Sequence, residues 1–248
     1  MDEFTLYLMC NTSKAYFPHN SSNMFTVKLD KAISFENYAD WELAMLDIIY
    51  PSSIYTLNGE KAVILDETGN EISILHFPSI QCTSLTELVT QLNNGHNERY
   101  FQFAVEHPHR IKLTVFAPYT IVFEQALTDI LCLDQSNIPH QATPMISSDT
   151  PSLTRHVDYL YVYTNIGHYV RVGDVQAPLL RYFPFTSSSS SSQKSKTFIK
   201  RLFVGLNQSE IEQIEVSIRD GAGDLVPFSD STATTQLTLQ FRRRRRRH

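Results

Sequence analysis

Two short segments contain residue types that could bind a metal ion. His107-Pro108-His109 has a His-x-His spacing, but no acidic residue follows within the next ten positions to complete a ligand set. Asp220-Gly221-Ala222-Gly223-Asp224 begins like a calcium loop, yet its twelfth residue is Ser231, where an EF-hand loop needs glutamate. We therefore interpret both segments as turns between strands, and we expect no metal site.

A third segment, the basic run before His248, could contact phosphate groups. Six adjacent like charges repel one another and do not pack, so we expect this tail to extend from the fold. Its function has three interpretations: non-specific phosphate contact by counterion release, a nuclear localisation signal, or a solvated tail with no function. The candidate nucleic-acid contacts are Arg242, Arg243, Arg244, Arg245, Arg246 and Arg247.

Charge is distributed unequally along the chain. Six of the 21 basic residues lie in the tail, so residues 1–241 carry 15 basic and 26 acidic residues, a net charge of −11. A domain that binds nucleic acid usually has a basic face on its body. The only concentrated positive charge here is therefore terminal.

Composition excludes several classes of protein. With 42% hydrophobic and 19% charged residues in 248, the chain is long enough for a globular core and is not typical of disorder. No apolar stretch reaches the about 18 to 20 residues of a membrane helix, and the acidic start lacks the features of a secretory signal. Cys10, Cys82 and Cys132 are an odd number without metal-ligand spacing, which is typical of free thiols in a reducing compartment. Nucleophile-elbow, P-loop and dinucleotide motifs are absent, so the sequence predicts neither an enzyme nor a cofactor.

Short segments of alternating polarity, rich in β-branched and aromatic residues, dominate the chain and predict strands. Glu67–Asn70 and His107–His109 each separate two such segments and predict hairpins. The predicted strands include 4–8, 25–29, 41–46, 63–65, 72–75, 101–105, 111–115, 120–123, 159–163, 177–183, 197–204, 211–218 and 237–241.

Two segments instead have helical spacing. Ser84–Asn94 has a plausible N-cap in Ser84 with Glu87 three residues later, as in a capping box. Ala126–Leu133 is a shorter candidate. Residues 187–196 contain six consecutive serines and predict an exposed, flexible loop.

These patterns together predict an all-β fold, a β-sandwich or a jelly roll, with one or two short helices in inserted connections. We expect one domain over residues 1–241, with a helical insertion near 83–94, the Ser-rich loop 187–196, and a basic tail at 242–248. Because the chain ends of a jelly roll can pair, deletion of Phe4–Leu8 should destabilise the whole domain.

Nine segments of the chain carry a family resemblance, and they extend over nearly the whole chain: 4–8, 16–20, 25–29, 41–45, 161–166, 172–181, 211–220, 223–228 and 237–243. In their order and spacing they resemble the penton (minor capsid) proteins of Polinton/Maverick elements and adintoviruses. Departures are the serine run, the long arginine tail and Ser229-Asp230-Ser231, where a glycine-containing turn is commoner. The residues that match the family motif are Gly173, Asp174, Pro178, Leu179, Leu180, Arg181, Arg219, Asp220, Pro227 and Phe228.

This resemblance implies that residues 1–241 form a single jelly-roll β-sandwich. It implies a structural protein at the five-fold vertices of an icosahedral capsid. It implies a homopentamer seated among hexagonal capsomers of a double jelly-roll major capsid protein, with no membrane partner and with assembly in the host nucleus or cytoplasm. Packaged double-stranded DNA is the expected partner of the tail. Two rival functions remain: a carbohydrate- or receptor-binding jelly-roll module without a capsid role, and a cupin-like enzyme.

Overall fold

The computed structural model describes residues 2–94, 99–107, 109–140, 143–187, 191–229 and 232–244. The chain divides into two compact units, one formed by Met1–Ile54 with Val157–His248 and the other by Tyr55–His156. The single domain expected over 1–241, with an insertion only near 83–94, differs from this division. The reason is that residues 55–156 form a hydrophobic core of their own, which strand alternation alone does not reveal.

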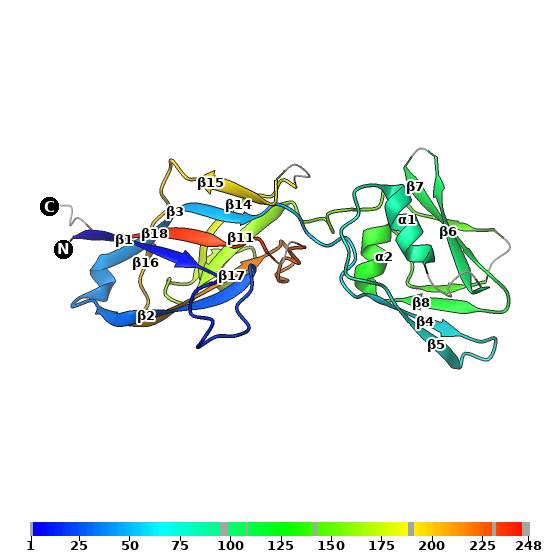
Figure 1. The fold of residues 1–248 in the computed structure, drawn as a ribbon, viewed down its shortest axis with the longest axis horizontal. Helices are drawn as coiled ribbons and strands as arrows, with labels where there is room; N and C mark the ends of the chain where they lie inside the picture. Colours follow the sequence, from blue (N-terminus) through cyan, green and yellow to red (C-terminus); the bar gives the residue numbers. More distant parts are fainter. Residues whose placement is uncertain are drawn as a thin grey trace. The chain divides into compact units, whose positions relative to one another are not determined.

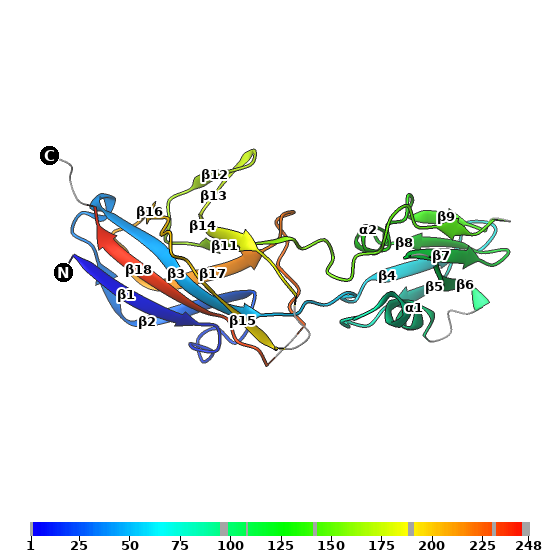
Figure 2. The same ribbon diagram turned by 90° about the horizontal axis from the view of Figure 1, so that it is seen from above.

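The first unit contains two antiparallel sheets (Figures 1 and 2). One has the order β1-β18-β3-β15, with β16 also paired to β3, and the other has the order β14-β11-β17-β2. The main strands are β1 (Glu3–Met9), β2 (Met24–Ser34), β3 (Trp41–Pro51), β11 (Tyr159–Thr164), β14 (Leu179–Pro184), β15 (Gln193–Thr197), β17 (Glu210–Arg219) and β18 (Gln236–Arg243).

The order of these eight strands defines the fold. Lettered B to I along the chain, they form sheets B-I-D-G and F-E-H-C, which is the jelly-roll arrangement. The first and last strands pair over seven residues, from Glu3 opposite Arg242 to Met9 opposite Gln236. The predicted all-β jelly roll is thereby confirmed.

The core of the jelly roll lies between the inner faces of the two sheets. Leu8, Leu43 and Phe241 come from one sheet, Phe25 and Val162 from the other, and all are at most 1% exposed. Alternation places every second side chain on this inner face, which is why the short alternating segments became strands. The burial of both sheets against each other is the main stabilising contribution to this unit.

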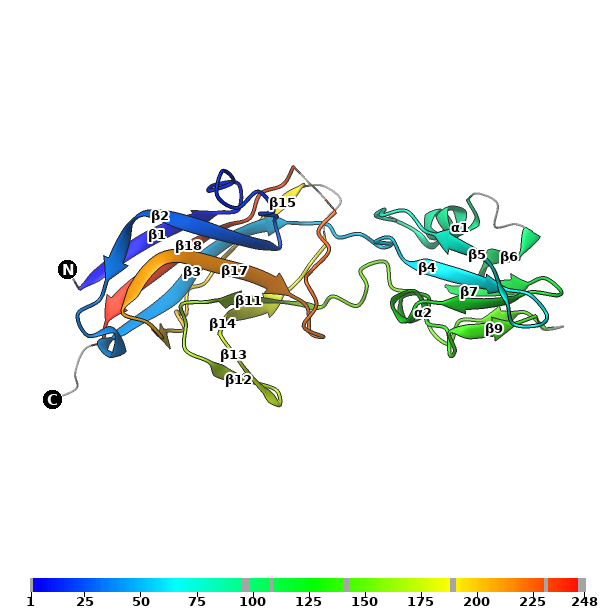
Figure 3. The same ribbon diagram turned by 90° about the horizontal axis from the view of Figure 1, so that it is seen from below.

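Shorter elements connect the strands of the jelly roll. Strands β12 and β13 form a hairpin, which lies between β11 and β14 in the sequence (Figure 3). The connecting elements are the 3-10 helix η1 (Tyr38–Asp40), β12 (Val170–Val172), β13 (Val175–Ala177) and β16 (Val204–Gly205).

The predicted Ser-rich loop corresponds only in part to a loop. Residues 193–197 form β15, which pairs with β3 from Gln193 opposite Pro51 to Thr197 opposite Asp47, so the prediction of a loop up to Lys196 was wrong. The edge of β3 supplies backbone partners that compensate for the polar sequence of this strand. Residues 188–190 of the predicted loop lie outside the described residues.

The second unit combines two small sheets and two helices. One sheet has the order β5-β4-β8-β9 and the other β10-β7-β6. Helices α1 and α2 lie where the sequence predicted short helices (Figure 1). The elements are β4 (Lys61–Leu65), β5 (Glu71–His76), α1 (Leu85–Asn93), β6 (Phe101–Glu106), β7 (Arg110–Val115), β8 (Thr120–Phe123), α2 (Gln125–Leu131), β9 (Asn137–Pro139) and β10 (Met145–Ile146).

Helix α1 begins at the predicted cap. The backbone N–H of Glu87 donates to Ser84 Oγ at 3.2 Å, and the Glu87 carboxylate accepts from the backbone N–H of Thr83 at 2.8 Å. Two backbone N–H groups at the helix start therefore have a side-chain partner. In an ideal capping box the glutamate would accept from the N–H of the cap residue Ser84, whereas here it accepts from Thr83, one residue earlier. The apolar face of the helix buries Leu88 and Leu92 in the core of this unit.

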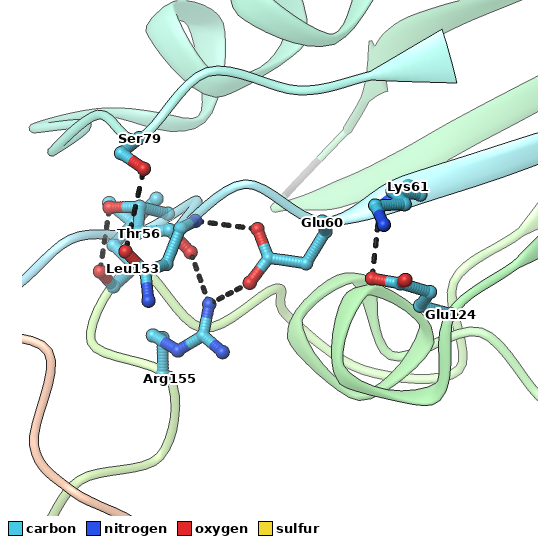
Figure 4. Close-up of polar contacts among 8 residues, drawn as sticks. Thr56, Glu60, Lys61, Ser79, Glu124, Leu153 and Arg155 are labelled. Carbon is cyan, nitrogen blue, oxygen red and sulfur yellow. Dashed lines mark hydrogen bonds and ion pairs between the residues drawn. The ribbon is translucent and has the colours of Figure 1, made fainter. Parts of the chain in front are cut away.

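A polar cluster closes the second unit where the chain enters and leaves it (Figure 4). Thr56 Oγ1 donates to the carbonyl of Leu153 at 2.8 Å, and Arg155 forms an ion pair with Glu60, which is only 4% exposed. The Glu60 carboxylate also accepts from the backbone N–H of Asn58 at 2.6 Å. These contacts hold the two ends of the unit together, and we call this cluster the neck.

Candidate functional site

The first three arginines of the basic run pack on the jelly roll. Arg242 lies opposite Glu42 in the β18–β3 register, and its Nη2 is 2.6 Å from Glu42 Oε1. Arg244 Nε is 3.2 Å from the other oxygen of the same carboxylate, and Arg243 is 3.9 Å from Asp40. The expectation that the tail extends from the fold was therefore wrong for these three residues.

An aromatic ring and a glycine complete this arginine cluster. The guanidinium of Arg242 lies over the ring of Phe203, 3.3 Å from its centroid. At Gly205, a Cβ would lie 2.8 Å from Arg244 Nη2 and 2.9 Å from His168 Cδ2, so a larger residue would displace one of these side chains. Glycine at this position gives Arg244 and His168 the space to approach the backbone of β16.

The arginine cluster is ion-paired but partly open to solvent. Two arginines share the single carboxylate of Glu42, which is 13% exposed, and the side chains of Arg242 and Arg244 are 43% and 52% exposed. The positive charge of the described arginines is therefore partly compensated by acidic side chains. Residues 245–247 of the predicted nucleic-acid contacts lie outside the described residues.

The residues of the predicted family motif lie in several parts of the jelly roll. Gly173 has a φ of +60° in the turn between β12 and β13, next to Asp174. Leu180 is buried in the core beside the half-buried Leu179, and Arg181 lies over the ring of Phe198 at 4.3 Å. Burial lowers the pKa of Arg181, and its Nη1 donates to the carbonyl of Lys200 at 3.0 Å.

The C-terminal part of the motif forms a turn and part of the core. Asp220 Oδ1 accepts from the backbone N–H groups of Ala222 and Asp224, at 2.9 and 3.0 Å. Gly223 has a φ of +94°, which favours glycine, so the segment is the turn that the sequence predicted. After Pro227, Phe228 is buried and bridges to Ile54.

Two motif residues come together at a surface pocket of about 410 Å³ on the jelly roll. Pro178 and Arg219, which are 41 positions apart in the sequence, both line it. The sequence alone did not indicate the other members, because the β11–β17 pairing and the contact of Thr164 with Pro178 bring them together only in the folded unit. The remaining lining residues are Tyr163, Thr164, Asn165, Tyr169, Ala177, Glu215 and Ser217.

The outer face of β11 and β17 provides one side of this pocket. Tyr163 lies opposite Ser217 in the register, and Tyr161 lies opposite Arg219. Burial raises the pKa of Tyr163, and so does the nearby Tyr161, while Arg219 opposes the shift. The hydroxyl of Tyr163 is therefore protonated at neutral pH and can donate a hydrogen bond.

The two segments that contain possible metal ligands do not bring a set of ligands together in the described part of the chain. Within the described ranges, no group of three or more His, Cys, Asp or Glu side chains could hold a metal ion. His107 and His109 lie at the β6–β7 turn, as predicted, with Pro108 between them outside the described residues. In the part of the chain that the structure describes, no helix is long and apolar enough to cross a membrane.

Comparisons with known proteins found similarity to solved structures. No protein-family model matches the chain, and no curated protein matches it. The mavirus penton protein is similar over 98% of this chain and 100% of its own, with 10% identity and a TM-score of 0.46. A chain of the Sputnik virophage structure is similar over 98% of both chains, with 11% identity and a TM-score of 0.48. The resemblance read from the sequence was to penton proteins, and one of these two structures is a penton protein.

Proposed function

We propose that this chain is a structural minor capsid (penton) protein that forms a homopentamer at the five-fold vertices of an icosahedral capsid. The observation that carries the proposal is the jelly-roll strand order, B-I-D-G and F-E-H-C, found together with the motif residues on that fold. Its partners in the capsid would be other copies of itself and a double jelly-roll major capsid protein. Its location would be the virion, after assembly in the host nucleus or cytoplasm.

The outer faces of the two sheets suit a subunit that associates with copies of itself. On β11 and β14, Tyr161 and Tyr182 stack with ring centroids 5.8 Å apart, and Tyr182 is 54% exposed. On β1, Tyr7 is 72% exposed. Exposed tyrosines are common anchors at protein interfaces. A closed ring needs two different faces that meet head to tail, each contact burying about 1,200 to 2,000 Å².

The test of the proposed function is the oligomeric state of the full chain. Light scattering after size exclusion should give five times the 28.4 kDa subunit mass, and negative-stain images should show five-fold rings. Tyr182→Ala should shift the mass toward the monomer if this face takes part in the ring. A monomer at all concentrations and salt conditions would overturn the proposal.

We further propose that the basic run contacts packaged double-stranded DNA. Arg242, Arg243 and Arg244 are paired with acidic residues, so at most three unpaired arginines are left for phosphate groups. Each phosphate contact contributes about −0.9 to the slope of log affinity against log salt, so the slope should be about −3. Involvement of all six arginines would give about −5.

A pair of variants tests this division of the arginines. Deletion of residues 245–248 should remove most of the salt-dependent affinity for a DNA duplex. Glu42→Gln should steepen the slope, because it frees Arg242 and Arg244 from their shared carboxylate. Equal affinity for DNA with and without residues 245–248 would contradict the proposed contact with DNA. Loss of the ring on deletion would instead favour a tail that bridges neighbouring subunits.

The absence of a catalytic role is part of the proposal. Metal analysis of the purified protein separates it from a cupin-like enzyme, since such an enzyme would hold a stoichiometric metal ion. A stoichiometric metal would contradict a purely structural role.

A further inference from the structure

The surface pocket on the jelly roll is separate from the arginine cluster, and its strand β11 also carries Tyr161 of the face proposed for the ring. Its volume of about 410 Å³ lies within the range of small-molecule sites, about 300 to 1,000 Å³. Strands β11 and β17 supply Tyr163, Ser217 and Arg219, and the connection toward the β12–β13 hairpin supplies Asn165 and Tyr169. The pocket thus lies where regular sheet meets a connection that carries motif residues.

Hydrogen bonds hold the polar groups of the pocket in place. Asn165 Oδ1 accepts from the backbone N–H of Glu215 at 2.9 Å, and the Asn165 carbonyl accepts from Asn207 Nδ2 at 2.9 Å. Arg219 Nη1 donates to the carbonyl of Gly223 at 2.7 Å. The backbone N–H of Thr164 donates to the carbonyl of Pro178 at 3.1 Å, which ties the strand to the connection. A site whose groups are already ordered loses little entropy when a ligand binds.

Two aromatic side chains, Tyr163 and Tyr169, line the pocket. Tyr169 is 62% exposed although it is a large aromatic residue. Tyr163 is half-buried and pairs across the strands with Ser217. The stacked Tyr161 and Tyr182 continue the aromatic surface along β11 and β14. A ligand with a flat apolar face would cover these rings and still reach hydroxyl groups beside them.

The charges of the pocket narrow the class of ligand. Glu215 and Arg219 carry opposite charges on the same strand, so the lining has no net charge. A phosphate or polyanion would be repelled by Glu215 and would meet only one arginine. A wholly apolar ligand would cover the polar side chains of Ser217 and Glu215 without offering them a hydrogen bond.

A pyranose ring fits this chemistry. It presents an apolar C–H face on one side and a rim of hydroxyl groups that both donate and accept hydrogen bonds. Tyrosine rings can cover the first, and amide, carboxylate, guanidinium and hydroxyl groups can bind the second. We propose that the pocket binds one neutral pyranose unit of a glycan, an activity separate from the proposed pentamer.

Saturation-transfer NMR on the full chain tests the proposal. The probes are the methyl glycosides of glucose, galactose, mannose and N-acetylglucosamine, each at millimolar concentration. We expect transfer to the ring protons of at least one of them. Tyr169→Ala should weaken that sugar's affinity about tenfold, and Tyr163→Phe, which removes only the hydroxyl, should weaken it about threefold.

A matched control and the oligomeric state separate the alternatives. Tyr16→Ala removes a similarly exposed tyrosine, 64% against 62% for Tyr169, from the connection between β1 and β2 and should leave sugar binding unchanged. No transfer to any of the four sugars, or transfer that Tyr169→Ala does not reduce, would overturn the proposal. Dissociation of the ring by Tyr169→Ala, without sugar binding in the wild type, would make the pocket a contact between copies. Rings that persist without sugar binding would leave the proposed capsid function intact.

Discussion

The jelly roll and the inserted unit are both built from alternating strands, but they differ in which strands pair. In the inserted unit, β4 pairs with β5 and β6 with β7 across short turns. In the jelly roll, β1 pairs with β18 and β17 with β2, so its sheets require both ends of the chain. Contacts that are distant in sequence form slowly and depend on every participating segment. The jelly roll should therefore be the more easily disrupted of the two units.

Deletion of Phe4–Leu8 should have the largest effect. It removes five of the seven β1–β18 register pairs and the fully buried Leu8, and it exposes the edge of β18. We expect the thermal transition of the jelly roll to be lost, while the inserted unit keeps its own transition. Circular dichroism together with hydrogen exchange over 61–65 and 85–93 would measure this. One shared transition that disappears completely would contradict the independence of the two units.

Expression of residues 55–156 alone sharpens the same comparison. These residues have their own core, and the neck joins Thr56 to Leu153 and Glu60 to Arg155 near the two ends of the segment. We expect a cooperative thermal transition and dispersed amide signals in an NMR spectrum. A chain without a transition would show that the unit needs the jelly roll to fold.

Glu60→Gln should destabilise the inserted unit through the neck. It leaves the partly buried Arg155 without its anion, and loss of one partner from a buried ion pair costs about 3 kcal/mol. Glu67→Gln, in the exposed β4–β5 turn, is the matched control and should change stability by less than about 0.5 kcal/mol. Urea unfolding of both variants measures the difference. Equal unfolding midpoints would show that the ion pair of the neck does not stabilise this unit.

Replacement of residues 187–190 by a short Gly-Ser turn should change stability little. Loop closure costs only about 0.6 kcal/mol per doubling of length, so we expect an unchanged melting temperature and an intact ring. Removal of Gln193–Thr197 is the contrasting change, because it deletes β15 from the edge of β3. A large loss of stability in the first variant, or loss of its ring, would place the serine segment in the fold or the interface.

Thiol labelling should show the smallest effect, a difference in rate. Burial raises the pKa of Cys82 to about 11, and Glu87 adds to the shift. At pH 8 only about one Cys82 side chain in a thousand would be a thiolate. Raising the pH toward 11 should therefore increase the rate at which Cys82 is labelled. Cys132 is only partly buried, so it should react first. Faster labelling of Cys82 would contradict the closed core of the inserted unit.

The sequence by itself predicted the fold class, both helices and most of the strands, but it missed β15 and predicted a strand over 198–203, where the structure has none. Alternating polarity predicted the strands, Ser84 and Glu87 predicted the start of α1, and Asp220–Asp224 predicted a turn. These features depend on neighbours within a few positions, where side-chain periodicity and capping groups act directly. The order and spacing of the motif residues added the resemblance to penton proteins.

Only the tertiary structure decided which distant residues meet. The serine-rich segment continues into a strand because β3 offers it a paired edge, and Arg242–Arg244 pack on the body because β18 places them opposite Glu42 and Asp40. Asn165 and Arg219 line one pocket because β11 pairs with β17. Pairing between strands is a non-local interaction whose register is set by the packed core, so it is absent from the local pattern of any one segment.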